Sequence, residues 1–387
     1  MHRTVTAFAI LCTILATTAH ACLWDRDTLA AEAKGLPGIT EIITGRFDRF
    51  PPLFYEMRLE RVTKELASDP DSLALFDDAG VACDRLGRSD EAIGWMERKR
   101  ETMERLEAGG GDVGEHRYRY LANLGTFHIH RWLNAGADRG DMGDVERSRE
   151  LIAAAIELNP DAHFGRERYQ LLAIEWILNQ DVLLNGKADS IFSQVPGYTA
   201  NRPSYGRNEL ASLGYSDAIE GLSGLISLGS AWQSVDIYYA LAWALAERGD
   251  NLLAHLCMVR VNELVEQGHQ SLSINFREYV NLEYGPGSDH VRDEARNTIS
   301  TDYYTMARKE ASHWIELRNA YLSDRLNQGS HPDTNPDFWN AWTETSSPPD
   351  MPGRVNLMLV IPVGFVVLIL IGFLIYRVVL HRFTKPI

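Results

Sequence analysis

Apolar residues recur every three to four positions between Asp71 and Arg100, which predicts two short amphipathic helices. The polar interruption between them is Leu86-Gly87-Arg88-Ser89. Gly87 can adopt the left-handed backbone conformation that ends a helix, and Ser89 is a suitable N-cap for the next one. Small and large apolar residues are combined as closely packed helices require, with Ala79, Gly80, Ala82 and Ala92 beside Phe76, Leu86 and Met96.

Two further stretches repeat this pattern of paired helices. One begins at Arg119 and continues into a second predicted helix over Glu146–Leu158, and the other covers Asp236–Glu266. A long final helix, or two, is predicted over Asp289–Asn327. Residues 181–215 are polar and contain several Pro and Gly residues, which predicts an irregular insertion.

These three helix pairs resemble tetratricopeptide repeats, a family of helix-turn-helix units of about 34 residues. In the first pair the resemblance rests on Phe76, Ala79, Gly80, Cys83, Gly87, Ala92 and Met96. It implies an all-α fold in which successive pairs stack into a right-handed helical solenoid with a concave surface. The family usually has Ala where this chain has Lys99, so we expect looser packing at that helix end.

The resemblance also implies which residues face a partner. First-helix positions line the concave groove in the family, and their counterparts here are Asp77, Asp84, Arg85, Thr126, His130, Tyr239, Trp243 and Glu247. Tyr239 and Trp243 are four positions apart and would form one aromatic ridge. Arg85 could clamp a carboxylate of the partner. Trp243 could also pack into the neighbouring helix pair, and its role would then be structural.

Both ends of the chain are apolar, but over different lengths. The apolar run Ala7–Leu15 and the Ala19-His20-Ala21 pattern predict a secretory signal peptide over residues 1–21. Residues 355–376 carry no charge and are long enough to span a bilayer. Basic residues in 377–387 then predict a cytoplasmic tail. We therefore expect a single-pass membrane protein whose N-terminal domain is extracytoplasmic, and periplasmic in a Gram-negative cell.

These patterns divide the chain into eight parts. They are a signal peptide (1–21), N-terminal helices that we interpret as a divergent repeat (22–70), tetratricopeptide-like repeats (71–180), an irregular insertion (181–215), a further repeat with capping helices (216–328), a Pro- and Ser-rich stalk (329–354), a transmembrane helix (355–376) and a basic tail (377–387).

The part between the two apolar ends is strongly acidic. Residues 22–354 hold all 53 Asp and Glu and all but four of the 38 Lys and Arg, a net charge of −19 that disfavours nucleic acid as a partner. No HExxH, GxSxG or P-loop motif occurs. The GxGxxG sequence at 109–114 follows a charged predicted helix instead of a strand, so we interpret it as a linker. We predict no catalytic residues, no cofactor and no metal.

The sequence favours a binding module over an enzyme. We expect a scaffold of the cell envelope that docks a protein or peptide segment, of unknown identity, in its groove. Two alternatives stay open. An envelope hydrolase would show an ordered pocket ringed by acidic residues near 186–235, and a purely structural spacer would show a filled groove without exposed aromatic residues. Whether Cys22, directly after the cleavage pattern, is lipidated also stays open.

Overall fold

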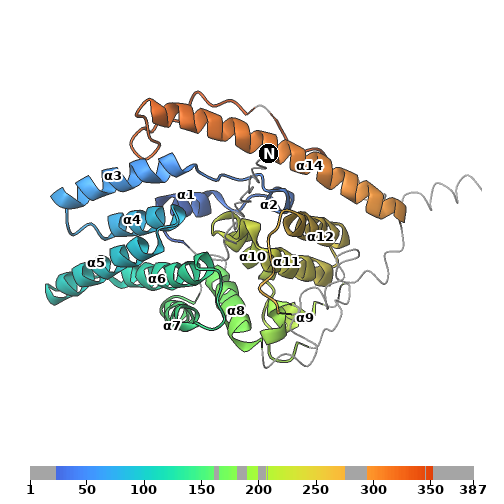
Figure 1. Cartoon of the computed structure of the whole chain (residues 1–387), viewed down its shortest axis with the longest axis horizontal. Coiled ribbons are helices and arrows are strands. Elements are labelled where there is room, and N and C mark those ends of the chain that lie inside the picture. The colour runs from blue at the N-terminus through green and yellow to red at the C-terminus, as the bar shows by residue number, and fades with distance from the viewer. Residues whose placement is uncertain are drawn as a thin grey trace, which may run out of the picture. The chain divides into compact units, whose positions relative to one another are not determined.

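The computed structural model of the 387-residue chain describes residues 23–160, 165–180, 190–198, 206, 208–274, 294–344 and 346–351. The chain divides into two compact units, Met1–Pro349 and Asp350–Ile387, and the description below concerns the first. Its described residues are all-α and contain no strand (Figure 1). The helices are α1 (Arg26–Lys34), α2 (Ile39–Thr44), α3 (Pro52–Ser68), α4 (Leu73–Arg85), α5 (Ser89–Ala108), α6 (Gly114–Asn134), α7 (Gly143–Leu158), α8 (Arg166–Asn179), η2 (Ile191–Gln194), α9 (Glu209–Ser212), α10 (Ala218–Ser227), η3 (Ala231–Gln233), α11 (Val235–Arg248), α12 (Asn251–Glu266) and α14 (Glu294–Asn327).

The first predicted helix pair is present as α4 and α5. α4 ends before Gly87, whose φ of 74° is rarely adopted by residues with a side chain. Gly80 allows close helix packing, because a Cβ atom there would lie 2.9 Å from Met96 Cε. The predicted cap at Ser89 is wrong. α5 begins at this residue without a side-chain cap, and its hydroxyl accepts a hydrogen bond from Asn134 Nδ2 at 3.2 Å.

The second and third predicted pairs correspond to α6–α7 and α11–α12. Each helix from α3 to α8 packs against the next one in the chain, and α8, α10, α11 and α12 continue the series (Figure 1). α4 also packs against α6, so the first helices of neighbouring pairs are in contact. The predicted long final helix is a single helix of 34 residues, α14, which packs against α2, α3 and α12.

The segment after α14 differs from the stalk predicted for 329–354. Phe338 is fully buried in a cluster with Phe54 of α3 and Leu322 of α14. Asp333 accepts hydrogen bonds from the buried Arg58 at 2.6 and 2.8 Å. The segment is polar on average, but a few of its aromatic and charged residues pack onto the helices. The stalk prediction is therefore wrong around Asp333 and Phe338.

Several sequence predictions concern residues outside those that the structure describes. They are the signal peptide (1–21), much of the insertion (181–215), the transmembrane helix (355–376) and the basic tail (377–387). In the described part of the chain, no helix is both long enough and apolar enough to cross a membrane.

Candidate functional site

The facing sides of α4 and α6 form a polar surface, here called the α4–α6 face and defined by Asp77, Asp84, Arg85, Asn123, Thr126 and His130. Two contacts join the helices across it. Asn123 Nδ2 donates to Asp77 at 3.0 Å, and His130 Nδ1 donates to Asp84 at 2.8 Å. Both contacts join residues 46 positions apart, so the two helices run parallel and in register. The contacts are separated by about two helical turns.

Residues 23–27 of the chain, here called the N-terminal segment, cover the contact between Asp77 and Asn123. Asn123 accepts a hydrogen bond from the Trp24 backbone N–H at 2.7 Å and donates one to the Trp24 carbonyl at 3.0 Å. The Trp24 side chain is 1% exposed. Its ring lies 4.4 Å from the guanidinium of Arg166, and its Nε1 donates to Glu167 at 3.1 Å. The segment is thus held by its backbone and by one buried aromatic side chain.

Beneath this segment lies a buried ion pair. Lys99 is fully buried and donates to both carboxylate oxygens of Asp77 at 2.6 and 2.7 Å. Burial lowers the pKa of Lys99, and the attraction of Asp77 opposes this effect. The expectation of loose packing at Lys99 is therefore wrong, because an ion pair accommodates the larger side chain. Thr126 is also fully buried and accepts a hydrogen bond from Gln170 at 3.1 Å.

Arg58 of α3 holds the N-terminal segment from the other side. Its guanidinium donates to Asp25 at 3.1 Å, to Asp27 at 2.7 and 3.0 Å, and to Asp333. Burial raises the pKa of Asp27 to about 6 against the attraction of Arg58, and the neighbouring Asp25 and Asp333 carboxylates raise it further. The same arginine therefore ties the N-terminal segment to the segment that follows α14.

A cavity of about 1200 Å³ opens at the second contact. Three of the predicted groove residues, Asp84, Arg85 and His130, lie in its wall. The rest of the wall comes from α1, the loop before α3, the start of α3, the end of α6, the connection between α10 and α11, α14 and the segment after α14. Its aromatic lining residues are Phe47, Phe50, Phe54, Tyr55, Trp232, Trp314 and Trp339.

Two of the arginines in the cavity wall differ from the other two in their partners. Arg46 and Arg318 pair with carboxylates, whereas Arg49 and Arg85 form no ion pair with any described carboxylate. Arg85 donates to neutral oxygens of the 228–230 loop at 2.8–3.1 Å. Arg49 lies 4.4 Å over the ring of Trp232, and burial lowers its pKa to about 10. Both guanidinium groups therefore contact the connection between α10 and α11, which includes η3.

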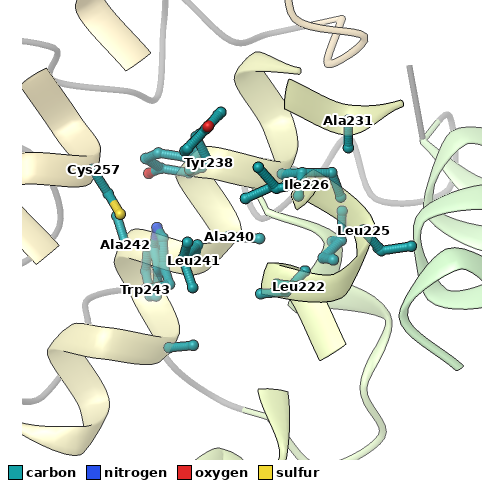
Figure 2. Close-up of a cluster of buried hydrophobic side chains, with 14 of the residues drawn as sticks. Leu222, Leu225, Ile226, Ala231, Tyr238, Ala240, Leu241, Ala242, Trp243 and Cys257 are labelled. Atoms are coloured by element: carbon teal, nitrogen blue, oxygen red, sulfur yellow. The ribbon is translucent and has the colours of Figure 1, made fainter. Parts of the chain in front are cut away.

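The α11 residues predicted for the groove lie in a hydrophobic core instead of the cavity wall. Tyr239 and Trp243 are 4% and 3% exposed, and their rings pack edge to face at 6.1 Å. Figure 2 shows Trp243 within this buried cluster. Glu247 is buried and accepts hydrogen bonds from the Tyr198 hydroxyl at 2.7 Å and from the Leu210 N–H at 3.0 Å. Trp243 therefore packs into the core, which is the structural role that its sequence position left open.

Sequence reasoning missed Asn123, Arg49 and Trp232. Asn123 falls between the positions transferred from the repeat family, and Arg49 and Trp232 lie outside the three helix pairs on which the resemblance rests. The shared spacing of 46 residues between the two α4–α6 contacts is a signal that could have identified Asn123.

In the parts of the chain that the structure describes, no group of three or more His, Cys, Asp or Glu residues is placed to hold a metal ion. No protein-family model matches the chain, and no curated protein or solved structure is significantly similar to it.

Proposed function

We propose that this protein is a membrane-anchored, extracytoplasmic scaffold that docks a segment of another protein in the cavity beside the α4–α6 face. The main support is that the cavity has Asp84, Arg85 and His130 in its wall, three residues that the repeat resemblance assigned to partner binding. Its volume of about 1200 Å³ exceeds that of most small-molecule pockets and leaves room for several residues of a peptide.

The packing of the helices supports the repeat interpretation within this proposal. The three predicted pairs are pairs of consecutive, contacting helices, and the first helices of the first two pairs, α4 and α6, pack against each other. Stacked pairs of this kind build the right-handed solenoid of tetratricopeptide repeats. A solenoid presents its first helices on one surface, which is where a partner would bind.

The N-terminal segment illustrates how the α4–α6 face can hold a peptide. Asn123 binds both polar groups of one backbone residue, a contact that does not depend on the side chain of the bound residue. Trp24 supplies the side-chain anchor in a buried site. Backbone hydrogen bonds combined with pockets for selected side chains are a recurrent mode of peptide recognition.

Obstruction of the cavity tests the docking proposal. Asn134 lies at the end of α6, is exposed and lines the cavity, so Asn134→Trp should fill part of it. The matched control is Glu101→Trp, an exposed position on α5 that does not line the cavity. Tagged full-length chain should capture a partner from solubilised envelopes, and only Asn134→Trp should reduce the yield. Equal yields from both variants would count against docking in the cavity.

The membrane part of the proposal has its own test. External protease added to cells without an outer barrier should remove residues 22–354 and spare the basic tail. Full protection of the large domain would contradict the proposed orientation.

A further inference from the structure

The charges of the cavity are distributed unequally between its walls. On one wall, Asp25 and Asp27 are already engaged by Arg58. On another wall, Arg49 and Arg85 donate only to neutral oxygens or lie over aromatic rings among the described residues. Arg308 and Arg260 add positive charge near Arg49, and the nearby Asp48 is paired with Arg318. A positive charge that is partly removed from water and has no counter-charge favours the binding of an anion. In a domain with an excess of acidic residues, two such arginines beside the same connection between α10 and α11 are a specific feature.

His130 lies in the wall of the same cavity and holds the Asp84 carboxylate. Its Nδ1 donates to Asp84, and the residue is 6% exposed. Its second ring nitrogen, Nε2, is buried and has no hydrogen-bond partner among the described residues. Because Nε2 has almost no accessible surface, a ligand in the cavity would meet the two arginines and not this atom.

The shape of the site favours a peptide over a small anion. The cavity adjoins the place where residues 23–27 are held on the α4–α6 face, so a bound chain would lie next to a segment already held there through its backbone. The ring of Trp232 lies beneath Arg49 and offers an apolar surface beside the positive charge. Such a wall suits a carboxylate with an aromatic or apolar neighbour.

We propose that the cavity binds an acidic peptide segment, with a carboxylate at the wall shared by Arg49 and Arg85 and an aromatic or apolar residue against Trp232. This inference rests on the proposed docking function and specifies the chemistry of the partner segment.

Two fluorescein-labelled hexapeptides test the proposal with the purified full-length chain. One has the sequence Gly-Trp-Glu-Glu-Trp-Gly, and the other replaces both Glu residues by the neutral, similarly shaped Gln. We expect fluorescence anisotropy to show the Glu peptide binding at least about ten-fold more tightly, since the arginines would form charge-assisted hydrogen bonds with it alone. This comparison needs no variant of the protein.

Three arginine variants then locate the site. Arg49→Gln and Arg85→Gln should each weaken binding of the Glu peptide about ten-fold or more and leave the Gln peptide unaffected. Arg98→Gln is the matched control. Arg98 also lies over a tryptophan ring, at 3.6 Å from Trp95, but it is exposed on α5 and does not line the cavity. Its replacement should change affinity less than about two-fold. Circular dichroism checks that each variant is folded.

Three results would overturn the proposal. The first is that the wild-type chain fails to prefer the Glu peptide, including the case in which neither peptide binds at about 1 mM. The second is that Arg98→Gln weakens binding as much as Arg49→Gln. The third is that inorganic phosphate at matched ionic strength displaces the Glu peptide completely, which would indicate a small-anion site. None of these results depends on the capture experiment with Asn134→Trp, so docking could stand while its acidic preference fails.

Discussion

The two contacts that join α4 to α6 are chemically similar, but their surroundings differ. Asp77–Asn123 lies under the N-terminal segment, whereas Asp84–His130, two turns further on, lines a cavity. In the covered contact, Asn123 satisfies the backbone of Trp24, and the carboxylate has a buried lysine. In the other, His130 Nε2 lacks a partner among the described residues. The difference shows that a helix pattern can identify a polar face without revealing which part of it is available.

The largest expected effect concerns the ion pair beneath the covered contact. Lys99→Ala leaves the buried Asp77 carboxylate without its cation, which should cost about 3–5 kcal/mol of unfolding free energy. Thermal and urea unfolding of the purified chain, followed by circular dichroism, would measure this. The control is Lys34→Ala, an exposed lysine at the cavity, which should change stability by less than about 0.5 kcal/mol. Similar small effects for both variants would show that the covered contact is not specially stabilised.

A comparable loss of stability is expected in the core of the third helix pair. Trp243→Ala should destabilise the protein by about 3 kcal/mol or more, because the ring is buried among other apolar side chains. Trp243→Phe should cost less than about 1.5 kcal/mol, since Nε1 has no hydrogen-bond partner among the described residues. Neither variant should change partner capture at a temperature where it is folded. If folded Trp243→Phe loses partner capture, Trp243 contributes to partner binding and its role is not only structural.

Substitution of two asparagines of α6 compares the covered end of the α4–α6 face, at Asn123, with the end near the cavity, at Asn134. Asn123→Ala leaves the Trp24 backbone groups and Asp77 with fewer partners and should cost about 2–3 kcal/mol. Asn134→Ala removes only a bond to the Ser89 hydroxyl near the cavity and should cost less than about 0.5 kcal/mol. Equal unfolding midpoints for the two variants would contradict the distinction between covered and open ends.

The sequence predicted the helices well because a helix is determined mainly by residues that are close together along the chain. Apolar spacing and the glycine at position 87 are sufficient to define α4 and α5, and α14 was similarly evident. The sequence could not predict what covers the α4–α6 face, because the covering residues are distant along the chain. Trp24 lies 99 positions from Asn123, and Arg85 lies 145 positions from Ser230. The eight predicted groove residues therefore include buried core positions as well as three that line the cavity.

The smallest predicted effect is a pH dependence at Asp27, which lies in the cavity wall and pairs with Arg58. Its pKa of about 6 in the folded protein exceeds the value of about 3.9 expected in the unfolded chain. Folding therefore takes up a proton at intermediate pH. The stability that this residue contributes is greatest below about pH 4 and is lost as the pH rises through 6. Between pH 7.5 and 5.0, the unfolding midpoint of Asp27→Asn should rise less than that of the wild type. An identical pH dependence would rule out a raised pKa at this position.

The most direct test of the account is photo-crosslinking in intact cells. A photoreactive amino acid replaces either Asn134, which lines the cavity, or Glu101, which is exposed on α5 outside it. If the open end of the α4–α6 face docks a partner segment, irradiation should give a discrete cross-linked species from position 134 and none from position 101. The species should weaken when Arg85→Gln is added, if the acidic preference also holds. A cross-link from position 101 alone, or from neither position, would contradict docking in this cavity.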